Sequence, residues 1–296
     1  MIIYNLGSIN IDQVYTVPHF PQAGETLATL SYMRMLGGKG ANQSIALAKA
    51  GAQIMHIGAI NAADEWLTTE MQSYGVDCGA VQHSEAATGH AIVTVNAAGE
   101  NQILLHAGAN AAIDIEAAIA LLDQASNEDW VLLQNETNGA AAFVAAAKAR
   151  GVKIAYSAAP FDADIALALL PDLDLLVVNE GEAAALATAT NAAPDKLGVP
   201  HLVITKGVEG ATYFGGTSVI TQQAYQVEAI DTTGAGDCFY GYFLAAMIAR
   251  HSIEHALRQA AAASALQVTK AGAAEAIPSK ADVLEFIETQ ESAARS

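Results

Sequence analysis

The sequence predicts an α/β fold in which a mostly parallel sheet lies between two layers of helices. Short apolar runs alternate with longer helical patterns along most of the 296 residues, which is typical of parallel strands covered by helices on both faces. Two stretches without a helical pattern interrupt this alternation, and we expect them to form a small antiparallel lid. A chain of this length buries about 73% of its unfolded surface, so its core needs no metal or disulfide. The length would allow two domains, and we expect one over residues 1–296.

The main body follows from the alternating runs. Apolar runs predict strands at residues 2–6, 53–57, 130–134, 153–156, 175–178 and 202–205. Helical patterns occupy residues 41–50, 64–74, 114–124, 139–150, 235–250 and 253–269. Glycines at positions 51, 75 and 151 follow three of these patterns, as expected for residues that end helices.

The lid follows from residues 13–35 and 88–107. The first stretch has aromatic and β-branched residues with turns at Pro18, Pro21 and Gly24. The second alternates over residues 91–95, turns at 96–99 and resumes at 102–105, which is typical of a hairpin. We expect these strands to cover a site or to form a dimer surface.

The composition excludes several function classes. The net charge is −18, from 31 acidic and 13 basic residues, and such a surface repels nucleic-acid phosphates and anionic lipid. Two cysteines, Cys78 and Cys238, do not make a disulfide framework. No apolar run approaches 18 residues, and no signal-peptide pattern opens the chain. We therefore expect a cytoplasmic protein that binds neither nucleic acid nor membrane.

The strongest motif is the stretch Asp231-Thr232-Thr233-Gly234-Ala235-Gly236-Asp237, which ends a strand and opens a small-residue helix. Glycines let the amides of Gly234, Ala235 and Gly236 converge, and the first amides of a helix bind anions. Asp237 lies beside them and is a candidate base for a hydroxyl nucleophile. The alternative is an ordinary strand–turn–helix junction in which Asp237 caps the helix.

Two further motifs have the chemistry of polyol binding. In Gly37-Gly38-Lys39-Gly40-Ala41-Asn42-Gln43, glycines allow close approach to the backbone, while Lys39 and Asn42 offer polar groups. In Gly7-Ser8-Ile9-Asn10-Ile11-Asp12, the alternation predicts that Asn10 and Asp12 face one side. The alternatives are a flexible loop with a solvated lysine and an Asx turn at a strand end.

Polar residues also follow other predicted strands, where open α/β sheets bind ligands. Glu136 follows one strand, and Thr205 and Gly207 follow another. Asn179 and Glu182 lie one helical turn apart, a spacing suited to hydrated Mg²⁺ between phosphates. The same two residues also fit a helix capping box, which is the alternative for this pair.

Together these stretches resemble the ribokinase (PfkB) family of carbohydrate kinases, from residue 2 to about residue 278. The string His106-Ala107-Gly108-Ala109-Asn110 adds to the likeness. The resemblance implies an α/β sandwich with a β lid and a homodimer formed through the lids. It implies a catalytic base at Asp237, an anion hole at Gly234, Ala235 and Gly236, and sugar contacts at Asn10, Asp12, Gly38, Lys39, Asn42 and Glu136.

The resemblance also implies ATP, Mg²⁺ and an activating monovalent cation, usually K⁺. Asn179, Thr205 and Gly207 match nucleotide positions, and Glu182 matches a residue that organises Mg²⁺. Asp231 and Thr233 match the positions that hold K⁺. The chain departs from the family pattern at Ala276, Ala261 and Ser157, where relatives tend to place a cation-ligating serine, a residue near adenine and an asparagine.

The resemblance implies ATP-dependent phosphorylation of a sugar, with D-ribose as the expected acceptor. Another sugar or a nucleoside is the alternative acceptor. The lid stretches hold one arginine, Arg34, and no lysine, which disfavours a phosphorylated acceptor. A binding protein without turnover is the third hypothesis, and the presence of Asp237 argues against it.

Overall fold

The main sheet has nine strands in the computed structural model, which describes residues 1–293. Their order is β13-β12-β11-β10-β9-β8-β1-β4-β5. Neighbours from β11 to β5 run parallel, and β12 and β13 add an antiparallel edge. The strands span Ile3–Leu6 (β1), Ile54–Asn61 (β4), Asp77–Ser84 (β5), Trp130–Leu133 (β8), Lys153–Ser157 (β9), Leu175–Asn179 (β10), His201–Thr205 (β11), Ala211–Gly215 (β12) and Ser218–Gln222 (β13).

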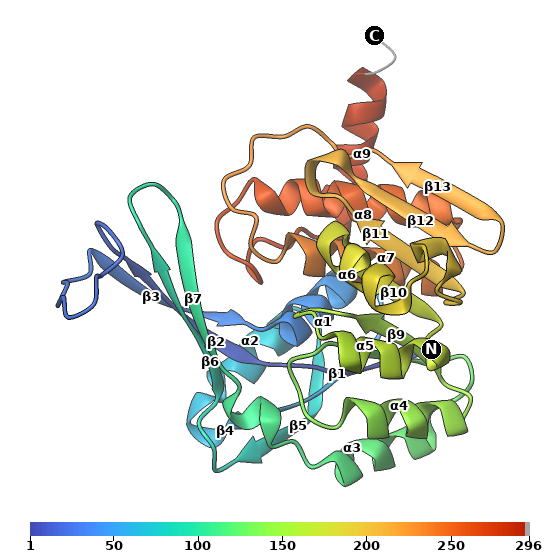
Figure 1. Cartoon of the computed structure of the whole chain (residues 1–296), viewed down its shortest axis with the longest axis horizontal. Helices are drawn as coiled ribbons and strands as arrows, with labels where there is room; N and C mark the ends of the chain where they lie inside the picture. The colour runs from blue at the N-terminus through green and yellow to red at the C-terminus, as the bar shows by residue number, and fades with distance from the viewer. Residues whose placement is uncertain (294–296) are drawn as a thin grey trace.

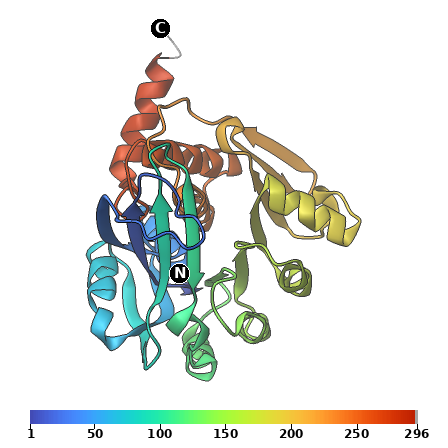
Figure 2. The same cartoon turned by 60° about the vertical axis from the view of Figure 1, so that its left-hand side comes forward.

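Helices cover both faces of this sheet, as Figure 2 shows. One face packs on α1 (Lys39–Lys49), α2 (Trp66–Ser73), α7 (Ala235–Ile248), α8 (Ile253–Val268) and α9 (Lys280–Ala293). The other packs on α3 (Ile115–Leu121), α4 (Ala140–Ala149), α5 (Ala163–Leu169) and α6 (Glu180–Thr190). Successive strand residues enter opposite cores, as Ile3 and Tyr4 do. Because both faces are buried, the central strands are mostly apolar. The predicted three-layer arrangement is confirmed.

A second sheet of four strands projects from one side of the body (Figure 1). It consists of β2 (Asn10–Thr16), β3 (Ser31–Gly37), β6 (Gly89–Val95) and β7 (Asn101–His106) in the order β3-β2-β6-β7. We call this sheet the lid. Both hairpins are antiparallel as predicted, but β2 and β6 pair in parallel. Local turns fix the direction of pairing within each hairpin and leave it open between two hairpins that are distant in sequence.

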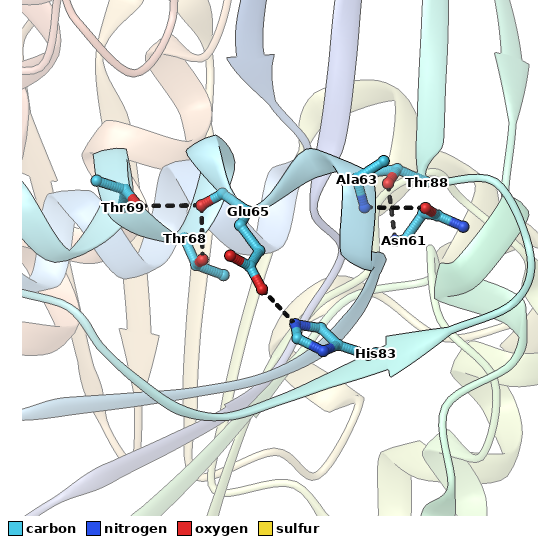
Figure 3. A network of polar contacts seen from close by, with 7 residues as sticks. All are labelled: Asn61, Ala63, Glu65, Thr68, Thr69, His83 and Thr88. Atoms are coloured by element: carbon cyan, nitrogen blue, oxygen red, sulfur yellow. Dashed lines mark hydrogen bonds and ion pairs between the residues drawn. The ribbon is translucent and has the colours of Figure 1, made fainter.

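Polar contacts tie the lid to the corner between β4 and α2, and Figure 3 shows one of them, between Asn61 and Thr88. The backbone N–H of Asn61 donates to Thr88 Oγ1 over 2.9 Å, and Thr88 Oγ1 donates to Asp64 over 2.7 Å. Arg34 of β3 lies over the ring of Trp66 at 4.5 Å and 3.8 Å from Asp64. These contacts fix where β3 and β6 leave the body.

The predicted elements differ from the observed ones mainly at their ends. The predicted helix at 64–74 begins after a 3-10 turn, and the predicted helix at 114–124 ends in one. The sequence patterns did not predict β5, β12, β13, α5 or the start of α9. Most residues of β13 and α9 are exposed or half-buried, so they lack the continuous apolar runs that mark the central strands.

Two expectations from composition can be compared with the described residues. Cys78 and Cys238 are both free and buried, which agrees with the absence of a disulfide framework. Among residues 1–293, no helix is long and apolar enough to cross a membrane.

Candidate active site

The carboxyl ends of the parallel strands bring together residues from distant parts of the chain. Ser8 follows β1, Glu136 follows β8, Asn179 ends β10 and Thr205 ends β11. Parallel strands expose their carboxyl ends at one edge of the sheet, where helix N-termini also begin. Helices α1 and α7 start at this edge, after Gly38 and Gly234.

Close packing of α1 against α7 sets the position of Asp237. A Cβ atom on Gly241 would overlap the side chain of Ala46, so the two helices approach at this point. One turn nearer to the N-terminus of each helix, Asn42 and Gln43 face Asp237. The glycine at 241 therefore lets two amide side chains reach a carboxylate on the neighbouring helix.

Asp237 is 8% exposed, and both oxygens of its carboxylate accept hydrogen bonds. Asn42 Nδ2 donates to Oδ2 over 3.2 Å, and Gln43 Nε2 donates to Oδ1 over 2.9 Å. Burial raises the pKa of Asp237, while Lys39, Gln43 and Asn42 oppose this rise. The result is a carboxylate that is more basic than usual.

Lys39 and Glu136 connect the start of α1 to the end of β8. Glu136 Oε2 accepts hydrogen bonds from Ser8 Oγ and from the backbone N–H of Lys39, the latter over 3.1 Å. Burial raises the pKa of Glu136. The Asp237 carboxylate, with Glu136 and Glu182, raises the pKa of the Lys39 ammonium. Lys39 is therefore a fixed positive charge among three carboxylates.

Asn10 and Asp12 enter the site from the lid strand β2. Asn110 Nδ2 donates to Asn10 Oδ1 over 2.8 Å, and Asn110 Oδ1 accepts from the backbone N–H of Ile9. Burial, together with the negative charges of Glu136 and Glu275, raises the pKa of Asp12 to about 6. The backbone of Gly38 lies against Ser8 and Asn10, at a φ of 97° that favours glycine.

A cavity of about 260 Å³ adjoins the start of α7. Its lining includes Thr205, Gly207, Ala235, Gly236 and Ala261. A Cβ atom on Gly236 would meet nothing within 4 Å, so open space lies beside this turn. The backbone N–H of Ala235 lies 3.3 Å from Thr232 O, a weak contact within the turn. The cavity is mostly apolar and has the helix N-terminus at one end, which suits a nucleotide.

Asp231 and Gln267 tie the loop before α7 to the loop at Gly272. Asp231 accepts hydrogen bonds from the backbone N–H of Thr233 over 2.9 Å and of Gly272 over 3.0 Å. Gln267 Nε2 donates to Thr233 O over 2.9 Å. Gln267 Oε1 is buried and has no hydrogen-bond partner among the described residues. A neutral oxygen of this kind is a suitable ligand for a monovalent cation.

Asn179 and Glu182 form a capping box at the start of α6. Asn179 Oδ1 accepts from the backbone N–H of Glu182, and Glu182 Oε2 accepts from that of Asn179. Burial raises the pKa of Glu182, and the charge of Lys39 opposes this rise. The capping alternative for this pair is confirmed. Within residues 1–293, no three His, Cys, Asp or Glu side chains gather to hold a metal ion.

The structure brings most of the predicted site residues to one edge and adds residues that sequence analysis missed. Ser8, Asn110, Gln43, Gln134 and Gln267 all contact predicted site residues or their neighbours. Three of them belong to motifs described above, yet nothing in the sequence assigned them a partner. Their partners lie on other elements, so spacing along the chain does not reveal the contacts.

Comparison with known proteins identifies relatives over nearly the whole chain. The family described as pfkB family carbohydrate kinase matches residues 3–280. The ribokinase of Haemophilus influenzae is 36% identical over 301 residues, which cover 96% of this chain and 97% of that protein. The ribokinase of Staphylococcus aureus is 37% identical over 292 residues, which cover 92% of this chain and 95% of that protein.

A solved structure extends the likeness to three dimensions. The structure of Arabidopsis thaliana ribokinase complexed with ribose and ATP has a TM-score of 0.85 and 29% sequence identity. The match covers 97% of this chain and 98% of that one. The lid and the three-layer body are therefore shared with an enzyme of known ligands.

Proposed function

Because the chain belongs to the pfkB family of carbohydrate kinases, we propose that it transfers the γ-phosphoryl group of ATP to D-ribose. The chain is a phosphotransferase that acts on a sugar hydroxyl, and the products of the proposed reaction are D-ribose 5-phosphate and ADP. The single observation that carries the proposal is the buried Asp237 carboxylate at the start of α7, which follows the cavity-lining Gly236 and is hydrogen-bonded to Asn42 of α1.

The sugar is proposed to lie between the lid and the start of α1. Asp12 and Glu136 accept hydrogen bonds from its hydroxyls, while Lys39 donates to its oxygens. Asn42 Oδ1 is buried without a partner among the described residues, so it is available to accept from a hydroxyl. Leaving such an oxygen unpaired is costly, and a bound polyol would remove that cost.

Asp237 is proposed to accept the proton of the attacking primary hydroxyl. Its raised pKa makes it a stronger base than an exposed aspartate. As the γ-phosphoryl group transfers in line, negative charge spreads over its oxygens. The amides at Gly234, Ala235 and Gly236, together with the positive end of the α7 dipole, stabilise that charge.

Metal ions are assigned to residues that the site already presents. When bound, Mg²⁺ would supply positive charge to the ATP phosphates, and the Glu182 carboxylate would hold it through water. One oxygen of Glu182 accepts within the capping box, which leaves the other oxygen for this role. Asp231, Thr233 and Gln267 Oε1 are proposed to hold K⁺, with Gln267 offering a ligand that Ala276 lacks.

The lid is proposed to exclude water and to mediate a homodimer. Its four strands place Met33, Ile103 and Leu105 on the same face as Asp12. These apolar side chains are 52%, 57% and 53% exposed. A second lid would cover them, since exposed apolar side chains in a continuous patch commonly mark an interface.

ADP release from Mg-ATP tests the proposed reaction. We expect turnover with ribose to exceed turnover with 2-deoxyribose, fructose, xylulose and adenosine, and each acceptor is measured with and without K⁺. The variant Asp237→Asn should keep ATP binding and lose about 10³-fold in kcat, because an amide does not accept the proton.

Each other outcome changes a specific part of the proposal. Faster turnover of a different acceptor keeps Asp237 as base and replaces ribose. A wild-type rate for Asp237→Asn removes this residue from the base role. Ligand-induced thermal stabilisation without ADP release from any acceptor supports a binding protein instead of a kinase. Equal rates with and without K⁺ remove the monovalent cation.

A further inference from the structure

A chain of buried amide side chains leads away from Asp237 into the core. Gln43 Nε2 donates to Asp237 Oδ1 over 2.9 Å, and Gln43 Oε1 accepts from Gln134 Nε2 over 2.7 Å. Gln134 Nε2 also donates to Asn5 Oδ1 over 3.1 Å. Gln43 and Asn5 are completely buried, and Gln134 is 1% exposed. The chain joins α1, β1 and the end of β8 to the carboxylate on α7.

The direction of every hydrogen bond in this chain is fixed at its far end. Asn5 Nδ2 donates to the carbonyl oxygen of Gly40 over 2.9 Å. A carbonyl only accepts, so the Asn5 amide must present its nitrogen to Gly40 and its oxygen to Gln134. Gln134 must then direct its nitrogen toward Gln43. Gln43 in turn has its oxygen occupied and its nitrogen aimed at Asp237.

A second set of hydrogen bonds, from the carbonyl oxygen of Gly7 through His56 and Ser44, fixes the orientation of the Asn5 amide in the same way. His56 Nε2 lies 3.1 Å from the carbonyl oxygen of Gly7, so this nitrogen carries the proton. Burial lowers the pKa of His56 to about 4, which keeps the ring neutral. His56 Nδ1 therefore accepts from Ser44 Oγ over 2.8 Å, and Ser44 accepts from Asn5 Nδ2. Both sets of hydrogen bonds leave Asn5 Oδ1 to accept from Gln134.

We propose that Gln43, held by Gln134, is a positioning residue that fixes the Asp237 carboxylate and reserves its second oxygen for the acceptor hydroxyl. This inference rests on the proposed function of Asp237 as the base. Because Gln43 Oε1 is bonded to Gln134, only Gln43 Nε2 can face Asp237, and it donates to Oδ1. This hydrogen bond restricts rotation of the carboxylate. Oδ2 accepts one hydrogen bond, from Asn42 Nδ2, and its second lone pair is the acceptor that remains for the hydroxyl proton.

A core role alone would not require this arrangement. An apolar residue at position 43 would fill the same space without burying an amide. The chain instead carries three buried amides with fixed directions and leaves Gln134 Oε1 without a partner among the described residues. A donor aimed at an ionised carboxylate favours the charged form, which is the form that acts as a base.

The test replaces each amide with methionine, which has similar length and no hydrogen-bonding amide. Gln43→Met should lower kcat by about 10–100-fold, because small displacements of a base slow the transfer. The KM values for ribose and ATP should stay within about threefold, since Gln43 contacts neither proposed ligand. Gln134→Met should give a smaller loss, and the double variant should resemble Gln43→Met, as expected for residues that act through one bond.

The pH profile separates positioning from packing. Loss of the donor raises the pKa of Asp237, so the acid limb of kcat/KM should move upward by about one unit. Lys39 on α1, Glu136 after β8 and the neighbouring Cys238 also interact with this carboxylate. All three are present in every variant, so the difference between profiles reports the amide alone.

Two controls complete the experiment. Gln259→Met removes a buried glutamine on α8 that does not belong to the row of hydrogen-bonded amides. The kcat and pH profile of this variant should match those of the wild type. In the Asp237→Asn background, Gln43→Met should have no further effect on kcat. If Gln43→Met does not fold, the kcat and pH profile of Gln134→Met are compared with those of the wild type, and the expected changes are in the same direction but smaller.

The outcomes distinguish this inference from the proposed function. An active wild type with unchanged kcat and pH profile in both variants would overturn the role of Gln43 and leave the kinase intact. Equal losses in the Asp237→Asn background would show that Gln43 acts through general packing. An inactive wild type would instead contradict the proposed function.

Discussion

Gly37 lies against the carboxylate of Asp12 so closely that a Cβ atom on Gly37 would overlap both carboxylate oxygens. The two residues occupy adjacent lid strands, with Asn10 opposite Gly37 and Asp12 opposite Met35. The Asp12 side chain therefore extends along the sheet over the missing side chain of Gly37. A glycine is required here for space, because Gly37 does not have a positive φ.

Substitution of this glycine should displace Asp12. We expect Gly37→Ala to raise the KM for ribose by about tenfold, roughly the value of one charged hydrogen bond, with little effect on the KM for ATP. Steady-state kinetics measure both values. Gly79→Ala on β5 is the matched control, since its new Cβ atom would lie 3.1 Å from one oxygen of Asp77. An unchanged ribose KM in Gly37→Ala would exclude Asp12 as a sugar contact.

Ribose affinity should depend on pH through Asp12. The carboxylate accepts hydroxyl hydrogens when ionised, and its pKa is raised to about 6. Below that pH, binding must first remove a proton, so Kd should rise about tenfold per pH unit. Above it, the contribution of Asp12 is constant. Calorimetric titration with ribose from pH 5 to 8 measures this, and Asp12→Asn should bind more weakly and lose the step near pH 6.

The cavity beside α7 should accept the nucleotide base near Ala261. We expect Ala261→Phe to fill part of the 260 Å³ space and to raise the KM for ATP about tenfold or more. The KM for ribose should remain within twofold, because the sugar residues lie on α1 and the lid. A rise in both KM values with a lower melting temperature would indicate general destabilisation and contradict this assignment.

The lid face formed by Met33, Ile103 and Leu105 should control association. We expect Ile103→Glu to convert a dimer into a monomer, since charges placed opposite one another in the joined lids repel and lose hydration. Sedimentation velocity across a range of concentrations measures the change, and Ile103→Leu should remain dimeric. A wild type that sediments as a monomer throughout would remove the homodimer from the proposal.

Candidate residues could be predicted where a reactive side chain lies within a local sequence pattern. Asp237 follows a glycine turn that opens a helix, and Asn10 and Asp12 alternate along one strand. Those features are local, so the residues alone identify them. Gln43 lies within a predicted motif but has its partners on β8 and α7, and no spacing along the chain indicates them. The same holds for Asn110, which meets Asn10 across 100 residues.

The sequence by itself determined the α/β class, the central strands and the motifs, because backbone preferences and hydrophobic periodicity act over a few residues. Only the tertiary structure decided that β2 pairs in parallel with β6, that Gly241 brings α1 against α7, and that buried amides connect Asn5 with Asp237. These depend on which distant surfaces fit together with their hydrogen bonds satisfied. Whether distant surfaces fit in this way depends on residues far apart in sequence, so it cannot be inferred from any short segment.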